Sequence, residues 1–176
     1  MSCDHGRSKS RILIVGPSGA GKSTLAVEVA ARLGLPLIHL DRYYWQPGWV
    51  ATPEPEWRVI VSELVARPAW VMDGNFGESF DLRLPRADLI VFLDLPRRIT
   101  IARVLRRIIG GLGKNRPDMA PGCPEKLDLE FLGWVWRFPR DERPRIGQAI
   151  GDTGTRERVT TLTTTREIRD WLSTLT

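Results

Sequence analysis

Gly16-Pro17-Ser18-Gly19-Ala20-Gly21-Lys22-Ser23 is the stretch of this sequence that decides the fold. It matches the pattern G-x-x-x-x-G-K-S/T, in which glycines let backbone N–H groups approach phosphate oxygens. A short apolar run, 11–15, precedes it, and residues 22–33 repeat apolar side chains at helical spacing. A strand, a glycine-rich turn and a helix N-terminus are the context in which this P-loop pattern holds the phosphates of a nucleotide. The stretch therefore predicts a nucleoside triphosphate site.

Two side chains of the pattern have specific expected partners. Lys22 is expected to reach the β- and γ-phosphates, and the Ser23 hydroxyl to complete the coordination shell of Mg²⁺. ATP and Mg²⁺ are thus the expected ligands. The residues predicted to bind the nucleotide are Gly16, Pro17, Ser18, Gly19, Ala20, Gly21, Lys22, Ser23, Thr24 and Arg103.

Short apolar runs alternate with longer helical patterns along the rest of the chain. The predicted strands are 11–15, 37–40, 69–72, 89–93 and 159–162. The predicted helices are 22–33, 54–66, 97–109, 125–138 and 166–174. This alternation predicts an α/β fold, a three-layer, doubly wound, five-stranded parallel sheet with a helical lid.

The whole chain, 1–176, is predicted to form a single P-loop kinase-like domain. Within it we expect a flexible tail at 1–10, a flap on the acceptor side at 41–66 and a basic lid at 110–145. Glycines in the segment 110–124 favour a hinged lid, and Pro139 is expected to end the helix 125–138.

Composition sets limits on the class of protein. The 176 residues are 42% hydrophobic and 27% charged, as in ordinary globular proteins, and only two are cysteines. We therefore expect no disulfide framework and a cytoplasmic protein, acting as a monomer or a homodimer. No apolar run has membrane-spanning length, and the polar first ten residues are unlike a signal peptide, so no membrane association is predicted.

Charge is concentrated in one segment. Residues 97–145 contain 12 Lys and Arg against 6 Asp and Glu, a net charge of +6, whereas the whole chain carries +5. A concentrated excess of this kind implies a polyanionic partner, either the phosphates of a nucleotide or a nucleic-acid backbone.

Three aspartates follow predicted strands, where parallel sheets place their ligand sites. Asp73 is the favoured carboxylate for Mg²⁺ because Gly74 after it permits close approach of a ligand, and Asp94, which could instead cap the next helix, is the alternative. Asp41 is expected to orient or deprotonate an acceptor hydroxyl. The aromatic cluster beside it, including Trp45, forms either an acceptor pocket or a structural hinge.

Arginines supply the remaining candidates. Arg103 and Arg107 share one face of the predicted helix 97–109 and are expected to face the nucleotide, with Arg107 in a catalytic role. Arg83 is a candidate for holding the acceptor, with an ordinary exposed arginine as the alternative. About two of four lid arginines are expected to close over the γ-phosphate, and Arg140 is assigned a catalytic role. The four are Arg116, Arg137, Arg140 and Arg143.

Several stretches together resemble a known family. They are 16–25, 39–41, 44–45, 48–49, 70–75, 82–88, 92–96, 116–125 and 131–138. In this combination the chain resembles the bacterial DNA topology modulation proteins, also called FlaR-like, within the adenylate-kinase-like P-loop kinases. The resemblance implies a small-kinase fold in which Arg103 and Arg107 look like the arginine pair that precedes a nucleotide-kinase lid. Asn75-Phe76-Gly77 replaces the Phe-Pro-Arg of adenylate kinases, which argues against AMP as acceptor.

These features favour an ATP- and Mg²⁺-dependent kinase that transfers the γ-phosphoryl group to a small acceptor, such as a nucleotide or nucleoside. The alternative is a nucleotide-gated, DNA-binding regulator whose basic segment contacts phosphates. No Asn-Lys-x-Asp sequence is present, which argues against a regulatory GTPase, and His5 and His39 are the only histidines available to a Ser-His-Asp hydrolase.

Overall fold

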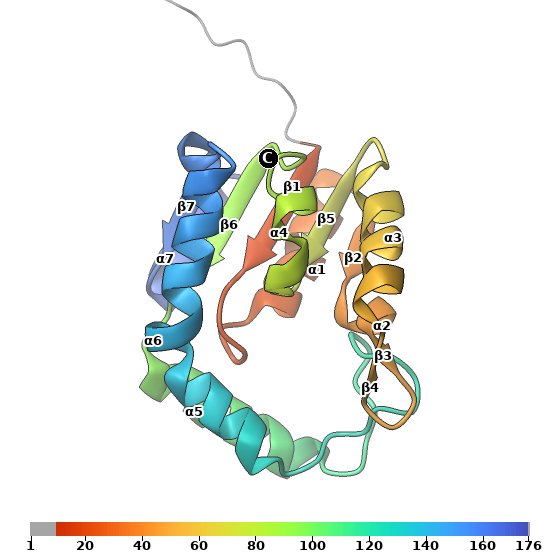
Figure 1. The fold of residues 1–176 in the computed structure, drawn as a ribbon. Coiled ribbons are helices and arrows are strands. Elements are labelled where there is room, and N and C mark those ends of the chain that lie inside the picture. The colour runs from red at the N-terminus through yellow and green to blue at the C-terminus, as the bar shows by residue number, and fades with distance from the viewer. Residues whose placement is uncertain (1–9, 176) are drawn as a thin grey trace, which may run out of the picture.

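The computed structural model describes residues 10–175, so most of the predicted tail, 1–9, lies outside the described residues. Five parallel strands form one sheet in the order β2-β5-β1-β6-β7 (Figure 1). The strands are β1 (Arg11–Val15), β2 (Leu37–His39), β5 (Trp70–Asp73), β6 (Leu89–Leu93) and β7 (Val159–Leu162). The predicted fold class is confirmed.

Helices connect the strands and cover both faces of the sheet. They are α1 (Lys22–Leu33), α2 (Asp41–Tyr44), α3 (Glu54–Val65), α4 (Phe80–Arg83), α5 (Arg97–Gly111), α6 (Leu129–Asp152) and α7 (Thr165–Ser173). Short 3-10 turns lie at Gly77–Ser79 and Arg156–Arg158, and an antiparallel hairpin is formed by β3 (Trp45–Gln46) and β4 (Val50–Ala51).

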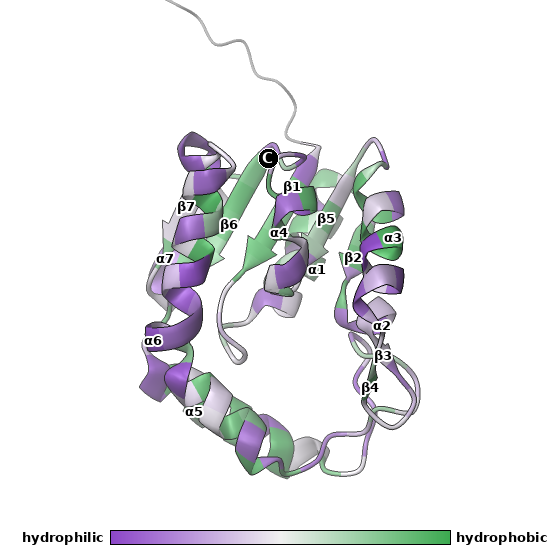
Figure 2. Ribbon diagram, in the orientation of Figure 1, coloured by the Kyte–Doolittle hydropathy of each residue, from purple (hydrophilic) through white to green (hydrophobic). Residues whose placement is uncertain are grey.

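The central strands β1 and β6 are apolar because both of their faces are covered, and both are largely green in Figure 2. Alternate side chains of a strand point to opposite faces, so Leu13 and Val15 contribute to one core while Ile12 and Ile14 contribute to the other. Each strand therefore anchors helices on both sides, which gives the sheet three layers.

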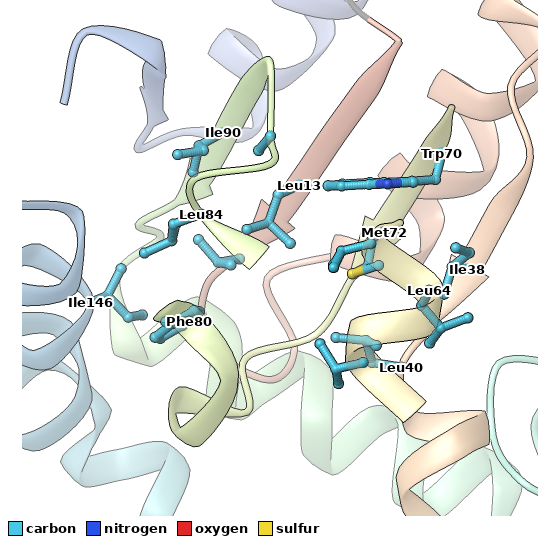
Figure 3. Close-up of a cluster of buried hydrophobic side chains, with 14 of the residues drawn as sticks. Leu13, Ile38, Leu40, Leu64, Trp70, Met72, Phe80, Leu84, Ile90 and Ile146 are labelled. Carbon is cyan, nitrogen blue, oxygen red and sulfur yellow. The ribbon is translucent and has the colours of Figure 1, made fainter. Parts of the chain in front are cut away.

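The first core lies between the sheet and α3, α4 and α6 (Figure 3). Met72 and Ile90 from the strands meet Leu64 of α3, Phe80 of α4 and Ile146 of α6 there. The second core lies between the opposite face and helices α1 and α7. Burial of these two apolar faces is the main stabilising contribution to the sheet.

Helices α5 and α6 project beyond the carboxyl end of the sheet. Figure 1 shows the chain between them crossing below the strands to reach the β3–β4 hairpin. Val104, Ile108 and Val135 form a small separate core between the two helices. The projecting arm thus has its own packing and covers the edge where the strands end.

The structure corrects the predicted end of one helix. The segment 125–138 was expected to stop at Pro139, but α6 continues through Pro139 and Pro144 to Asp152. Each proline removes one backbone hydrogen bond. The helix continues because its two halves both pack against buried residues, and both prolines lie on its exposed side.

The predicted flap and lid are narrower than their sequence ranges. Trp57 of α3 is fully buried in the first core, so only residues 41–53 of the range 41–66 extend over the strand ends. Phe138 is likewise buried in that core, so the second half of α6 belongs to the helical layer and the projecting part of 110–145 ends near Val135.

We predict that Gly16→Ala destabilises the fold by about 2 kcal/mol or more. A Cβ at Gly16 would lie 2.3 Å from the carbonyl oxygen of Leu93, and the glycine has φ +141. Gly110→Ala is the matched control, because its Cβ meets nothing within 4 Å inside α5 and alanine is the better helix former. Urea denaturation should show a lower midpoint for the first variant and an equal or higher one for the second. Equal midpoints for Gly16→Ala and wild type would contradict the close packing of the loop on β6.

Candidate active site

A short chain of hydrogen bonds joins three elements at the carboxyl edge of the sheet. The Ser23 hydroxyl at the start of α1 donates to Asp73 Oδ2 over 2.8 Å. His39 Nδ1, at the end of β2, lies 2.6 Å from Asp73 Oδ1. Asp73 ends β5 and is only 2% exposed. Its carboxylate therefore fixes the start of α1 and the end of β2 relative to the end of β5.

His39 is a structural partner in this arrangement. Burial disfavours its charge, but the hydrogen bond and the negative charge of Asp73 outweigh that effect and raise the pKa of the imidazole. The sequence interpretation of His39 as a satisfied strand residue agrees with this contact.

The donor set around Ser23 and Asp73 fits Mg²⁺. A hydroxyl and a carboxylate are hard oxygen ligands, and Mg²⁺ usually takes one or two such groups together with phosphate oxygens and water. Among residues 10–175, no group of three or more His, Cys, Asp or Glu side chains could hold a metal ion. The Ser23 hydroxyl and the Asp73 carboxylate are therefore of the kind that could hold Mg²⁺ together with phosphate oxygens and water, and their role as metal ligands stays a prediction.

The glycine-rich loop lines one side of a cavity of about 750 Å³. Residues 18–24 of the loop and of α1 face this cavity, as do Arg103 from α5 and Arg169 from α7. Helix α1 begins at Lys22 after Gly21, which has φ 97 and makes no side-chain cap. The first N–H groups of a helix have no partner inside it, so they remain suited to an anion.

Hydrogen bonds from Asn75 and Lys22 fix the conformation of the glycine-rich loop. Asn75 accepts a hydrogen bond from the Gly16 N–H over 2.9 Å and donates its own amide to the Gly16 carbonyl over 2.8 Å. The Lys22 ammonium donates to the Pro17 carbonyl over 3.1 Å. Burial lowers the pKa of Lys22, although Asp41 and Asp73 nearby oppose this shift. The lysine is thus held at the mouth of the loop.

A second cavity of about 540 Å³ meets the first. The residues common to both linings are Ser18, Lys22, Asp41, Arg107 and Arg116. The second cavity is otherwise lined by the hairpin, the turn after β5, the 112–128 loop and the start of α6. The two cavities therefore meet at one lysine, one aspartate and two arginines.

Asp41 is the carboxylate at this junction. It begins α2 directly after the end of β2 and lines both cavities. Burial raises the pKa of the Asp41 carboxyl above its ordinary value, with the charge of Lys22 acting in the opposite direction. A carboxylate with a raised pKa is a stronger base than an exposed one and is suited to take a proton from a hydroxyl.

The two junction arginines share one buried acid. Arg107 Nε lies 3.0 Å and Arg116 Nε 2.6 Å from Glu125 Oε1, and Glu125 is 5% exposed. Arg116 also pairs with Asp118 over 3.0 Å. Burial, and next the charge of Arg116, lower the pKa of Arg107. The neighbouring Arg103 donates to the Ala20 carbonyl over 3.3 Å and to Thr165 over 3.0 Å, which links α5 to the loop and to α7.

The hairpin and the loop between α5 and α6 are joined into a clasp, made of residues 45–51 and 119–124. Gly48 N–H donates to the Gly122 carbonyl over 2.8 Å, and Trp49 Nε1 donates to the Pro124 carbonyl over 3.0 Å. Met119 and Cys123 are buried against the hairpin. The predicted flap and the predicted lid are thus in contact with each other beyond the ends of the strands.

Most of the predicted site residues lie at the two cavities. Lys22, Asp41, Arg103, Arg107 and Trp45 line one or both of them. Gly16 and Pro17 lie behind the lining and hold the loop in shape through the contacts described above. Their roles toward ligands stay predictions.

Several predicted residues lie away from the cavities. Arg140 is exposed, pairs with Asp141 over 2.6 Å and lines neither cavity, because the turn of α6 directs it to solvent. Asp94 has its carboxylate 2.6 Å from Arg143, whereas Asp73 accepts a hydrogen bond from Ser23, so Asp73 is the better placed of the two candidate metal ligands. Of the four lid arginines, Arg116 is the one that lines the cavities.

Arg83, expected either to hold the acceptor or to be exposed, is instead completely buried and lines neither cavity. Its guanidinium donates to the carbonyl oxygens of Gly74, Asn75 and Phe76 and to the Ser79 hydroxyl. Burial lowers its pKa to about 9. Arg83 instead fixes the turn that follows Asp73, and this turn carries Asn75 and Phe76 into the site.

Sequence reasoning did not assign roles to Asn75, Glu125, Phe131 or Trp134. The signals for them were weak, because Asn75, Phe131 and Trp134 entered the sequence analysis only within the stretches that carry the family resemblance. Glu125 had one usable signal, because an acid in a segment rich in arginine invites an ion pair.

The comparisons with known proteins agree with this architecture. The chain is 30% identical over 129 residues to the uncharacterized protein YqaC of Bacillus subtilis (strain 168), which covers 72% of this chain and 71% of YqaC. The chain belongs to the same family as YqaC. A segment of 37 residues is 57% identical to shikimate kinase of Halorhodospira halophila, 21% of each chain. No protein-family model matches the sequence.

Solved structures share the fold over nearly the whole chain. A shikimate kinase from Bacteroides thetaiotaomicron superposes with a TM-score of 0.58 at 20% identity, covering 93% of this chain and 94% of that one. A shikimate kinase from Acinetobacter baumannii in complex with shikimate gives 0.56 at 19% identity, covering 94% and 90%. A gluconokinase from Sinorhizobium meliloti 1021 gives 0.54 at 18% identity, covering 96% and 94%. The fold is that of the P-loop kinases.

Within the described part of the chain, no helix is both long enough and apolar enough to cross a membrane. This agrees with the absence of membrane-length apolar runs in the sequence.

We predict that Arg83→Leu destabilises the protein by about 3 kcal/mol or more, because it leaves several buried carbonyl oxygens without a donor. Arg86→Leu is the matched control, since Arg86 is exposed three residues away in the chain. The measurement is the urea unfolding midpoint of each variant. An Arg83→Leu midpoint within error of the control would show that the turn after Asp73 does not depend on this side chain.

Proposed function

We propose that this protein is an ATP-dependent kinase that transfers the γ-phosphoryl group to the hydroxyl of a small acceptor. The observation that carries the proposal is the meeting of two cavities at Lys22 and Asp41, one formed around the P-loop and the other around the clasp. The relation in fold to shikimate kinases and a gluconokinase supports it.

In this proposal the nucleotide lies in the first cavity. Backbone N–H groups of the loop and the start of α1 bind the β- and γ-phosphates, and Lys22 leaves the Pro17 carbonyl to pair with them. Ser23 and Asp73 would hold Mg²⁺, which when bound neutralises developing charge on the phosphate oxygens. Arg103, linked to α7, lies where it can contact the rest of the nucleotide.

The acceptor lies in the second cavity with its hydroxyl at Asp41. The hydroxyl oxygen forms a bond to the γ-phosphorus while the bond from that phosphorus to the β–γ bridging oxygen breaks, and ADP leaves with the electron pair. The hydroxyl proton passes to the Asp41 carboxylate and then to solvent. Arg107 and Arg116 face both cavities and are placed to stabilise negative charge on the transferred group.

The clasp would exclude water during this step. Its two segments already contact each other through the backbone hydrogen bond from Gly48 to Gly122, the bond from the Trp49 indole to Pro124 and a small apolar core. Excluding water matters because a kinase without this protection transfers phosphate to water instead of the acceptor.

The structure offers no observation that favours the DNA-binding alternative. Much of the basic segment is paired internally, as Arg107 and Arg116 are with Glu125 and Arg143 is with Asp94. Attribution to the DNA topology modulation family therefore stays a prediction, which the kinship with YqaC leaves open.

We predict that Lys22→Ala lowers ATP affinity and turnover together, with turnover falling about 100-fold or more, because the lysine is the cation closest to the phosphate loop. Isothermal titration with ATP and Mg²⁺ and an assay of ADP formation measure the two quantities. Lys114→Ala is the control, since Lys114 is exposed and lines neither cavity. Unchanged ATP affinity in Lys22→Ala would refute the assignment of the nucleotide site.

We predict that Asp41→Asn lowers kcat by about 100- to 10,000-fold while ATP affinity changes only a few-fold, because the proton acceptor is lost. The raised pKa of Asp41 gives the pH dependence: the carboxylate is active when deprotonated, so kcat falls as the pH drops through this raised pKa. The wild-type profile of kcat against pH should therefore fall at a higher pH than it would if the base were an aspartate with an ordinary pKa.

Asp94→Asn is the control for this variant, since Asp94 lies outside both cavities and pairs with Arg143. It should retain kcat and the same pH profile. An Asp41→Asn enzyme that keeps wild-type kcat would exclude Asp41 as the base.

A further inference from the structure

The second cavity differs from the first in charge. Its lining carries four cationic side chains, Lys22, Arg107, Arg116 and Lys126, and four acidic ones, Asp41, Glu125, Asp128 and Glu130. Their formal charges cancel. The first cavity has five Lys and Arg against three Asp and Glu and is net positive, as the binding of phosphates requires.

Three of the four cations that line the second cavity form ion pairs with acids of the same lining. Glu125 neutralises Arg107 and Arg116 at 3.0 and 2.6 Å, and Lys126 lies 3.6 Å from Asp128. An anionic acceptor would have to compete with a carboxylate that is 5% exposed and already in contact with both arginines. Displacing a buried carboxylate from its partners is costly, so the cavity disfavours a second anion.

Aromatic rings form opposite parts of the lining. Trp45 and Trp49 of the hairpin meet edge to face at 5.5 Å, and Phe131 and Trp134 of α6 are stacked at 6.1 Å with planes 17° apart. Phe76, from the turn that Arg83 holds, adds a fifth ring. Flat aromatic surfaces bind planar rings by stacking.

Two residues with strained backbone conformations line the same cavity. In the described part of the chain, Trp49 and Phe76 are the two non-glycine residues with positive φ, at 65 and 39. Both line the second cavity. Each is held by its surroundings, Trp49 by its bond to Pro124 and Phe76 by Arg83. Strain maintained in this way is typical of positions that serve a ligand.

On these grounds we propose that the acceptor is an uncharged, planar heteroaromatic molecule with a free hydroxyl, of which a nucleoside is the leading example, and not a phosphorylated or carboxylated alcohol. This rests on the proposed kinase function. A cavity of about 540 Å³ is of the size that small ligands of this kind occupy. The ring lies among the aromatic side chains and the hydroxyl lies at Asp41, next to the γ-phosphate of ATP.

The test uses the intact protein with ATP and Mg²⁺ and matched acceptors. They are adenosine, guanosine, cytidine, uridine and thymidine, their 5′-monophosphates, and shikimate as a carboxylated alcohol. ADP formation is measured in a coupled assay, and binding is measured by quenching of tryptophan fluorescence in the presence of a non-hydrolysable ATP analogue. We expect at least one nucleoside to stimulate ADP formation about tenfold or more, and the monophosphates and shikimate to have no effect.

Two variants link the result to the cavity. Trp134→Leu should weaken nucleoside binding about tenfold with ATP affinity unchanged, because one stacking surface is lost. Trp136→Leu is the matched control: Trp136 is 51% exposed on the same helix and lies under Arg97 outside the cavity. Glu125→Gln should leave Arg107 and Arg116 with unbalanced charge and so increase the use of a 5′-monophosphate relative to its nucleoside.

The outcomes separate this inference from the proposed function. The inference would be overturned if ADP formation were stimulated only by a monophosphate or only by shikimate. It would also be overturned if the protein bound ATP but no nucleoside quenched its tryptophan fluorescence. Either result would leave the P-loop assignment intact. Equal nucleoside affinity in Trp134→Leu and Trp136→Leu would also overturn it. Unchanged ATP affinity in Lys22→Ala would instead refute the kinase proposal itself.

Discussion

The carboxylate of Asp73 is the constraint on which the rest of this structure depends. It accepts hydrogen bonds from Ser23, at the start of α1, and contacts His39, at the end of β2, from its own position at the end of β5. These are the three elements that meet at the P-loop edge of the sheet. The hydrogen bonds in a nearly water-free place are stronger than exposed ones, so the edge is held rigidly where the nucleotide site requires it.

The turn after Asp73 extends this order into the second cavity. Arg83 donates hydrogen bonds to carbonyl oxygens of this turn. Asn75 connects the turn to Gly16 of the P-loop through two hydrogen bonds, and Phe76 contributes a ring to the wall of the second cavity. The turn after Asp73 thus connects the P-loop with the second cavity. Its position depends on a charged residue inside the core. The charge is tolerated because the guanidinium donates hydrogen bonds to four oxygen atoms and lies 4.7 Å from the centroid of the Phe80 ring.

The sheet, the P-loop and the place of Asp41 and Asp73 could be predicted from the sequence, because apolar strand runs and the glycine pattern are local signals. The burial of Arg83 could not, since it depends on carbonyl oxygens that a turn brings together only in three dimensions. Which of Arg116 and Arg140 lies at the cavities could not be predicted for the same reason. Both lie in one basic segment, and only the path of α6 beyond Pro139 places one at the cavities and the other in solvent.

Glu125 explains how two arginines can lie beside Lys22 in a partly closed site. Bringing like charges together and removing them from water is unfavourable, and the lowered pKa of Arg107 reflects both effects. A single buried carboxylate between Arg107 and Arg116 offsets them and fixes the loop, since the Glu125 backbone also pairs with Leu112. The same acid balances the charges of the second cavity while the first cavity stays net positive, and under the proposed function this difference would give the two cavities different ligand preferences.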